Sequence, residues 1–220
     1  MKIVCLSFDD GTIYDEGFVA LLNRYGLKAT LNLNSGLKDF VWYFDDRPIR
    51  RLDLSKTVEL YKGHEVASHS LTHPYFSGLN EEQIVKEVGE DLDNLSSIFG
   101  EKVSGFAFPF IDQTEWNIEM VRKHFDLEYI RFSHMTNEYF PKDRYHIPIN
   151  AFYNNDDIYE KLEAFKRNEL ENSLFMIVGH SYEFEMRDEW GRIEALLAYL
   201  KENKDLTVMT ARDAVRYLFG

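Results

Sequence analysis

The fold is decided by the stretch Ile3-Val4-Cys5-Leu6-Ser7-Phe8-Asp9-Asp10-Gly11. Its first six residues form an apolar run with β-branched side chains, which predicts a buried strand over residues 3–8. Asp and Gly favour turns, so the strand is expected to end where the two carboxylates begin. The chain therefore opens with a buried strand that carries two adjacent acidic side chains at its carboxyl end.

The rest of the chain alternates short apolar runs with longer amphipathic ones. Asn80–Phe99 is the clearest helix, because its apolar residues fall on one face, Asn80 can cap its first turn and Gln83 occupies the capping-box position. The other predicted helices cover residues 16–24, 115–123, 157–167 and 189–202, with a final helix opened by Thr210 and Asp213. The predicted strands cover residues 3–8, 28–33, 64–68, 105–108, 127–132, 174–178 and 206–209.

Repeated strand-then-helix units indicate an α/β fold with a mostly parallel sheet and helices outside it. Seven or eight such units favour a closed or distorted (β/α) barrel over an open sheet. No Gly/Ser-rich or Pro-rich linker divides the chain, so a single domain over residues 1–220 is expected. Two segments break the rhythm and are expected to be loops or insertions, namely residues 36–54 and 134–155.

The formal net charge is −13, with 45% hydrophobic and 29% charged residues. This balance is typical of a globular protein. An acidic surface repels nucleic acid and anionic membranes, so neither is expected as a partner. The basic residues Arg47, Arg50 and Arg51 lie among acidic neighbours and are interpreted as a solvated mixed surface.

Cys5 is the only cysteine, which excludes an internal disulfide, and its apolar surroundings indicate an inert buried thiol. No apolar run approaches the roughly 20 residues of a membrane span. Residues 1–8 are too short and too soon polar for a signal peptide, so a cytoplasmic location is expected.

In a parallel barrel, the residues just beyond the carboxyl ends of the strands gather at one mouth. Five chemically interesting residues occupy such positions: Asp9, Asp10, His69, Pro109 and His180. Independent surface residues rarely coincide in this way, so the sequence predicts a functional site at this mouth.

His69 and His73 are spaced i, i+4, directly before Pro74. One helical turn would point both imidazoles the same way, and the proline would end that turn. Two histidines and a carboxylate are a common donor set for zinc and other divalent ions. Two surface or capping histidines are the alternative interpretation of the spacing alone, and the acidic pair at another strand end favours metal ligands.

Asp9 and Asp10 place two carboxylates side by side, which repel each other unless a positive group lies close. A turn needs only one aspartate and gains nothing from the second. The pair therefore favours a division of roles, in which one carboxylate binds an ion and the other accepts a proton from a water.

These residues fall within two longer motifs. Ser7-Phe8-Asp9-Asp10-Gly11 resembles the first motif of the polysaccharide deacetylases, the NodB-homology carbohydrate esterases of family 4. Their second motif is similar to Gly63-His64-Glu65-Val66-Ala67-Ser68-His69-Ser70-Leu71-Thr72-His73-Pro74. The resemblance runs in order along nearly the whole chain and implies a distorted (β/α) barrel with about seven parallel strands.

By this similarity, Asp9 is expected to be the general base. The resemblance implies that one divalent metal ion is held by Asp10, His69 and His73. Zn²⁺ is the usual ion in the family, with Co²⁺, Ni²⁺ and Mn²⁺ as alternatives. Two further residues match a family pattern and are expected to be buried structural partners, His64 and Glu65.

The third family motif usually reads Arg-x-Pro-Tyr, and the matching stretch here is Ala107-Phe108-Pro109-Phe110. Pro109 is retained, Phe110 keeps the aromatic wall, and the Phe110 backbone N–H matches the family's oxyanion donor. The arginine that orients the base in the family is replaced by alanine. Arg131 ends another predicted strand and could reach the Asp9 carboxylate, while a surface arginine explains its position equally well.

Val178-Gly179-His180 loosely matches the family's Leu-x-His motif, which implies that His180 is the general acid that protonates the leaving group. An acid that titrates near neutrality suits the expulsion of an amine, and a hydrogen-bonded structural histidine is the alternative. The carboxylate that tunes this histidine in the family has no clear counterpart. Three histidines lack spacing partners and are expected to be structural: His124, His134 and His146.

The expected function is that of a metal-dependent hydrolase that removes acyl groups, N-acetyl above all, from a carbohydrate or amino sugar. One alternative is a hydrolase of a small non-polymeric amide or formyl compound. Another is a catalytically silent carbohydrate-binding pseudoenzyme, which Ala107 and Ile111 favour and the retained acidic and histidine residues oppose. Core packing, rather than a sugar groove, is expected for Trp42, Tyr43, Phe44, Tyr75, Phe76 and Trp116.

Overall fold

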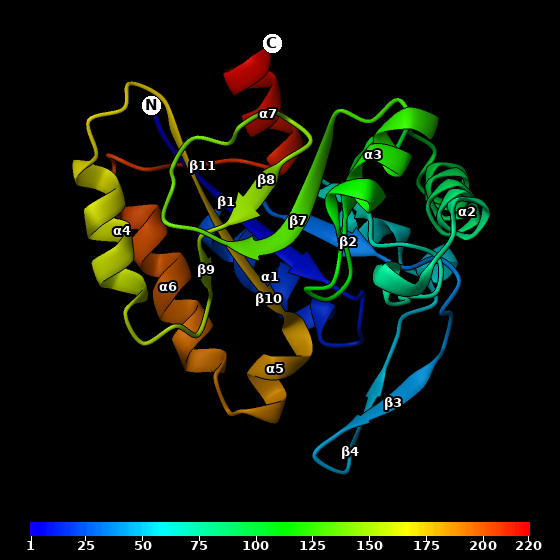
Figure 1. Ribbon diagram of the computed structural model, residues 1–220. Coiled ribbons are helices and arrows are strands. Elements are labelled where there is room, and N and C mark those ends of the chain that lie inside the picture. The colour runs from blue at the N-terminus through cyan, green and yellow to red at the C-terminus, as the bar shows by residue number, and fades with distance from the viewer.

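A computed structural model describes residues 1–220 and shows a curved, mostly parallel sheet with helices packed outside it (Figure 1). The strands of this sheet are β1 (Lys2–Asp9), β2 (Thr30–Leu33), β5 (Glu65–Ser68), β6 (Gly105–Ala107), β7 (Tyr129–Met135), β8 (Ile147–Ile149), β9 (Ala151–Phe152), β10 (Ser173–His180) and β11 (Thr207–Val208). A separate hairpin consists of β3 (Val41–Phe44) and β4 (Arg47–Arg50).

The helices are α1 (Asp15–Tyr25), α2 (Glu81–Phe99), α3 (Glu115–His124), α4 (Ile158–Arg167), α5 (Ser181–Met186), α6 (Trp190–Glu202) and α7 (Ala211–Phe219). The capping box predicted for α2 is confirmed, because the Asn80 side chain accepts from the Gln83 N–H and the Gln83 side chain accepts from the Asn80 N–H. Thr210 likewise caps α7 through the Asp213 N–H. None of the helices combines the length and the apolar character needed to cross a membrane.

The predicted barrel topology is confirmed. Eight strands follow the order β8-β7-β6-β5-β2-β1-β10-β9, and every neighbouring pair is parallel. The short strand β11 lies outside this path and pairs with the start of β1. The sheet therefore curves into a nearly closed, distorted (β/α) barrel.

Asn150 joins the two ends of the barrel, because it lies between β8 and β9, the first and last strands of the path. Its backbone N–H donates to the Met176 carbonyl on β10, and its side-chain oxygen accepts from the Met176 N–H. Its amide nitrogen also donates to the carbonyls of Thr136 and Glu138, beyond the end of β7. One buried residue thus supplies, through its backbone N–H and its side chain, the hydrogen bonds that a continuous ladder would otherwise provide.

The first strand is buried along both faces, as its sequence predicts. Alternate residues of a strand point to opposite sides. Val4, Leu6 and Phe8 pack into the large cluster beneath the helices, whereas Ile3 and Cys5 belong to the smaller cluster inside the barrel. Ser7 and Asp9 continue the inward-facing row, so the interior changes from apolar to polar toward the mouth.

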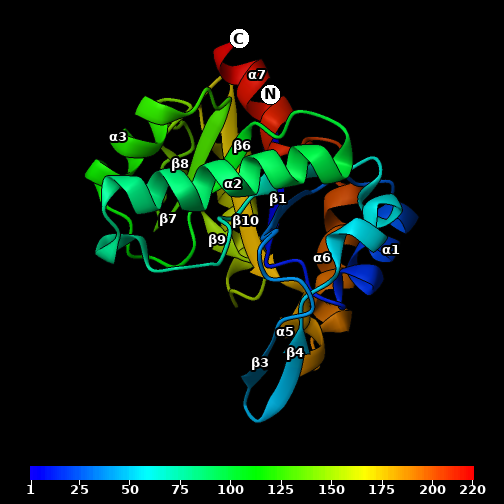
Figure 2. The same ribbon diagram turned by 90° about the vertical axis from the view of Figure 1, so that its right-hand side faces the viewer.

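Residues 36–54, expected to be a loop or an insertion, are an insertion whose larger part is an antiparallel hairpin outside the barrel sheet. Figures 1 and 2 show β3 and β4 projecting from the barrel. Asp45 and Asp46 form the tight turn with φ of 45° and 61°, the left-handed values that two-residue hairpin turns use. The turn was not recognisable because two aspartates, rather than an Asn-Gly or Asp-Gly pair, adopt this geometry.

The prediction of a loop or insertion over residues 134–155 is wrong, because this segment contains strands of the barrel. Strand β7 extends to Met135 with an irregular register after Arg131, and β8 and β9 complete the barrel. Strands of three and two residues are too short to show a period, so their presence depends on tertiary pairing.

Candidate active site

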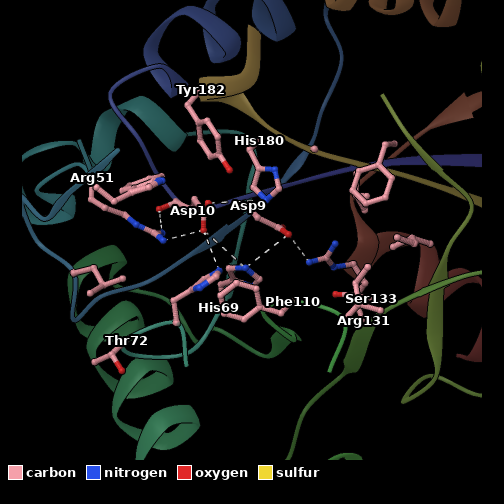
Figure 3. Close-up of a pocket in the computed structure, with 18 of the residues that line it drawn as sticks. Asp9, Asp10, Arg51, His69, Thr72, Phe110, Arg131, Ser133, His180 and Tyr182 are labelled. Atoms are coloured by element: carbon pink, nitrogen blue, oxygen red, sulfur yellow. Dashed lines mark hydrogen bonds and ion pairs between the residues drawn. The ribbon is translucent and has the colours of Figure 1, made fainter. Parts of the chain in front are cut away.

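Four of the five residues predicted to share the barrel mouth lie together there, whereas Pro109 does not line the cavity. They line a cavity of about 560 Å³, whose walls include Asp9, Asp10, His69, His73, Phe110, Arg131 and His180 (Figure 3). Strand ends and the loops after them supply these side chains except that of Arg131, because a parallel barrel brings its carboxyl ends to one opening. Arg131 projects from within β7.

Asp9 is held from two sides at the end of β1. The Asn32 amide donates to its Oδ1 at 2.6 Å, and the Arg131 guanidinium donates to its Oδ2 at 2.7 Å. Burial raises the pKa of Asp9, but the nearby Arg131 and His69 outweigh that effect and hold it below its ordinary value. Asp9 is therefore a fixed carboxylate at neutral pH.

Of the two interpretations of Arg131, the contact with Asp9 is present and the surface position is wrong. Strands β2, β5 and β6 separate β7 from β1 along the sheet, so Arg131 does not reach Asp9 from an adjacent strand. The guanidinium, 2% exposed, crosses the barrel interior. The Arg131 side chain thereby supplies a cation where Ala107 leaves none.

Asp10, His69 and His73 form a set that fits a divalent ion. One donor atom from each residue lies within 4.8 Å of the others, with the His73 Nε2 at 3.4 Å and the His69 Nε2 at 4.0 Å from the Asp10 Oδ1. That buried oxygen accepts no regular hydrogen bond, and its closest cationic neighbour is the Arg51 guanidinium at 2.9 Å. Two imidazole nitrogens and a carboxylate oxygen are the donors that zinc and related metals take.

The imidazole of His69 is oriented by the strand that carries Ala107. The Nδ1 of His69 lies 2.8 Å from the Ala107 carbonyl, which fixes the proton on Nδ1 and turns Nε2 toward the carboxylates. Burial lowers the pKa of His69 to about 3, so the ring is neutral, as a metal ligand must be.

The prediction of a single helical turn between His69 and His73 is wrong. The segment after β5 bends without forming a helix, and Ser70 and His73 have φ of 67° and 58°. The two rings nevertheless meet, with centroids 5.0 Å apart. The left-handed residues reverse the chain over a short distance and bring His73 back over the strand end.

Arg51 belongs to the site, so its interpretation as part of a solvated surface was wrong. It is 5% exposed, and its Nη2 lies 2.9 Å from the Asp10 Oδ1. Its Nη1 donates to the Asp10 carbonyl and to the Asn34 side chain. Asn34 in turn donates to the carbonyls of His69 and Ser70 at 2.5 and 2.7 Å. This network connects the segments that carry the potential metal ligands.

Phe110 follows Pro109 at the end of the β6 segment and has a φ of 55°. Its ring packs edge-on against His73 at 4.5 Å and stacks on Tyr75 at 3.9 Å. Its backbone N–H donates to no acceptor in the protein. The N–H is therefore free to serve a ligand beside the two histidines.

His180 ends β10 and lies on the other side of Asp9 and Asp10 from His69 (Figure 3). Its Nε2 is 4.0 Å from the Asp10 Oδ2, and its Nδ1 is 3.4 Å from the Glu183 Oε2. Burial alone would lower the pKa of His180, but Glu183 and Asp10 outweigh burial and raise it to about 9. Glu183 is the carboxylate partner for which the sequence offered no counterpart, and the i, i+3 spacing from His180 was its only signal.

The other histidines lie outside the cavity. His64 and Glu65 are buried in the sheet, where Glu65 accepts from the hydroxyls of Thr30 and Tyr129. His124 pairs with Glu81, whereas His134 stacks on Phe132 and His146 lies between Asp143 and Glu115.

The six aromatic residues expected in the core do not share one environment. Phe76 is fully buried, as expected, whereas Tyr43, Tyr75 and Trp116 are exposed. Trp42 lines the cavity. The prediction of core packing is therefore wrong for most of these six aromatic residues.

Comparisons with known proteins agree with the geometry. The family model described as polysaccharide deacetylase matches residues 1–129. No curated protein sequence matches the chain. A family 4 carbohydrate esterase from Streptomyces lividans, solved with acetate, superposes with a TM-score of 0.60 and 19% identity over 94% of this chain and 91% of its own.

Two other solved structures share the fold. A family 4 acetyl xylan esterase from Clostridium thermocellum, solved with a cobalt ion, has a TM-score of 0.63 and 17% identity over 98% of this chain and 91% of its own. A family 4 pseudoenzyme from Bacillus anthracis has a TM-score of 0.61 and 16% identity over 97% of this chain and 65% of its own. The family model matches residues 1–129, which is more than half of the chain. The chain therefore belongs to the polysaccharide deacetylase family.

Proposed function

We propose that the protein is a metal-dependent hydrolase that removes acyl groups, N-acetyl above all, from an acylated carbohydrate or amino sugar. The supporting observation is the position of Asp9, fixed by Arg131 at 2.7 Å, directly beside the Asp10, His69 and His73 set. A fixed carboxylate next to a potential ion site is what activation of a water requires.

The donor set and one relative support the metal. Asp10, His69 and His73 would hold one divalent ion, with Zn²⁺ favoured by two imidazoles and a carboxylate, and the Clostridium thermocellum esterase was solved with cobalt. When bound, the ion acts as a Lewis acid that polarises the acyl oxygen and lowers the pKa of a water molecule.

The chain's own groups then divide the remaining chemistry. Asp9 accepts the proton of the water that attacks the acyl carbon, while Arg131 and Asn32 hold the carboxylate in place. The free Phe110 N–H donates to the developing oxyanion. His180 donates its proton to the departing nitrogen as the carbon–nitrogen bond breaks, which leaves a carboxylic acid and a free amine.

The substrate class follows from the family and the leaving group. Acetate and acetyl xylan in the names of the two esterases support an acetylated carbohydrate. A protonated His180, paired with Glu183, suits an amine, which leaves only when it is protonated. An N-acetylated sugar is therefore the proposed substrate.

An Asp9→Asn variant tests the proposal. Asparagine keeps the shape but accepts no proton, so acetate release from N-acetylated chito-oligosaccharides should fall by about a hundredfold or more. Metal content should stay unchanged, because Asp9 is outside the proposed ligand set, whereas Asp10→Asn should lose metal as well. Undiminished acetate release by Asp9→Asn would contradict the assignment of the base.

A further inference from the structure

The hairpin of β3 and β4 reaches the catalytic mouth at its base. Leu37, Phe40, Trp42 and Arg51 from this segment line the cavity. We propose that residues 37–51 form the wall against which the departing sugar lies, and that they restrict the substrate to a neutral acylated sugar at the end of a short chain. This inference rests on the proposed deacylase function.

The wall is fixed to the barrel. Trp42 and Phe44, on one face of the hairpin, pack on Tyr182 of α5 with ring centroids 5.5 and 6.0 Å away. Arg47 donates to the carbonyls of Glu185 and Met186 at the end of α5, each at 3.3 Å. The hairpin and α5 therefore form one continuous surface.

The position of His180, the proposed general acid, places the leaving group on the side of the hairpin. His180 must touch the departing nitrogen, and its ring lies 5.1 Å from that of Tyr182, which meets Trp42. Figure 3 shows Tyr182 directly beside His180, with Arg51 on the Asp10 side of the site. The sugar that loses its acyl group consequently lies against Tyr182 and the hairpin.

The acyl group then lies on the opposite side, past Asp9 and Arg131. The cavity there is lined by Ile149, Phe152 and Val178, and Phe152 pairs with Val178 across β9 and β10. An apolar recess suits an alkyl group and offers nothing to a hydroxylated ring. The two apolar regions thus fix the direction in which the substrate lies.

An apolar surface also faces the hairpin across the mouth. Phe110, 38% exposed, stacks with Tyr75 at 3.9 Å and 11°. Phe40 on the hairpin segment is 49% exposed and lines the same cavity. Exposed aromatic side chains on both sides of the opening suit the C–H faces of one pyranose ring.

The charges at the mouth favour a neutral substrate. The two arginines that line the cavity are already paired, Arg51 with Asp10 and Arg131 with Asp9. No other arginine or lysine lines it. A phosphate or carboxylate on the sugar would therefore be desolvated without an unpaired arginine or lysine to receive it.

The regiochemistry of deacetylation tests the inference. On N-acetylchitopentaose, the metal-loaded wild-type protein should deacetylate one terminal unit, located by mass-spectrometric sequencing of the products. Free N-acetylglucosamine should also be a substrate. Phe40→Ala and Trp42→Ala remove parts of the wall, so the ratio of internal to terminal product should rise about tenfold, the effect of one apolar contact.

Tyr43→Ala is the matched control, since Tyr43 is on the opposite face of the hairpin and is 69% exposed. It should leave the product ratio unchanged. Internal deacetylation by the wild-type protein, or equal use of N-acetylglucosamine 6-phosphate, would contradict the inference and leave the proposed function standing. Release of no acetate from any substrate would overturn the proposed function and, with it, this inference.

Discussion

Two buried arginines each neutralise one carboxylate of the Asp9–Asp10 pair, Arg131 for Asp9 and Arg51 for Asp10. Two adjacent carboxylates at a strand end are unstable without such partners. The arrangement leaves each carboxylate ionised, one beside the water-activating position and the other among the histidines. Neither guanidinium is next to the acidic pair in the sequence.

Arg51 is expected to matter most when no metal is bound. Arg51→Met leaves the buried Asp10 carboxylate without a cation, which should cost about 3 to 5 kcal/mol of stability in the metal-free protein. A divalent ion can replace the lost counter-charge, so the increase in melting temperature on adding Zn²⁺ should be larger for Arg51→Met than for wild type.

Arg50→Met is the matched control, because Arg50 is exposed and pairs with Asp39 at the surface. Its response to Zn²⁺ should equal that of the wild-type protein. An Arg51→Met variant destabilised equally with and without metal would show that Arg51 acts through Asn34 and the loops alone.

At the scale of the elements, α2 is joined to the sheet by a buried acid, Asp91. Ser68 at the end of β5 donates to its Oδ2 at 2.6 Å, and the Ser35 N–H donates to its Oδ1 at 2.7 Å. Burial raises the pKa of Asp91 to about 6. The folded protein therefore holds the proton of the Asp91 carboxyl group more tightly than the unfolded chain does. As pH rises from the unfolded pKa through 6, the stability that this proton contributes is lost.

Asp91→Asn should remove this pH dependence. Between about pH 4.5 and pH 7.5, the unfolding free energy of wild type relative to the variant should fall by about 2 kcal/mol, because this range covers roughly one and a half of the two pKa units that separate the unfolded and folded states. Denaturant unfolding at the two pH values measures it. Asp93→Asn, exposed on the same helix, is the control. A constant difference between wild type and Asp91→Asn would show that Asp91 does not titrate in this range.

The elements divide sharply into those that the sequence predicts and those that it does not. Strand β1 and helix α2 carry their own signals, a continuous apolar run and a capped amphipathic face. The β3–β4 hairpin and the short strands β8 and β9 carry none, because their pairing partners and not their composition define them. The bend from His69 to His73 was mistaken for a helical turn because spacing alone does not report φ.

On the scale of the whole molecule, barrel closure explains which site residues were predictable. Residues that follow a strand share the mouth by topology, so Asp9, Asp10, His69 and His180 could be grouped from sequence. Arg51 comes from the base of the hairpin, where Thr12 and Arg51 form an isolated antiparallel bridge. Such long-range contacts form only when the barrel has closed, and no period or motif in the sequence predicts them.

The central claim is that the Asp10, His69 and His73 set holds a divalent ion on which deacetylation depends. The most direct measurement is metal content of the purified protein together with acetate release from N-acetylchitopentaose, before chelation, after chelation and after addition of Zn²⁺ or Co²⁺. The account predicts one ion per chain, loss of acetate release on chelation and recovery on adding metal. Acetate release that survives complete metal removal, or a protein that binds no ion even after reconstitution, would contradict it.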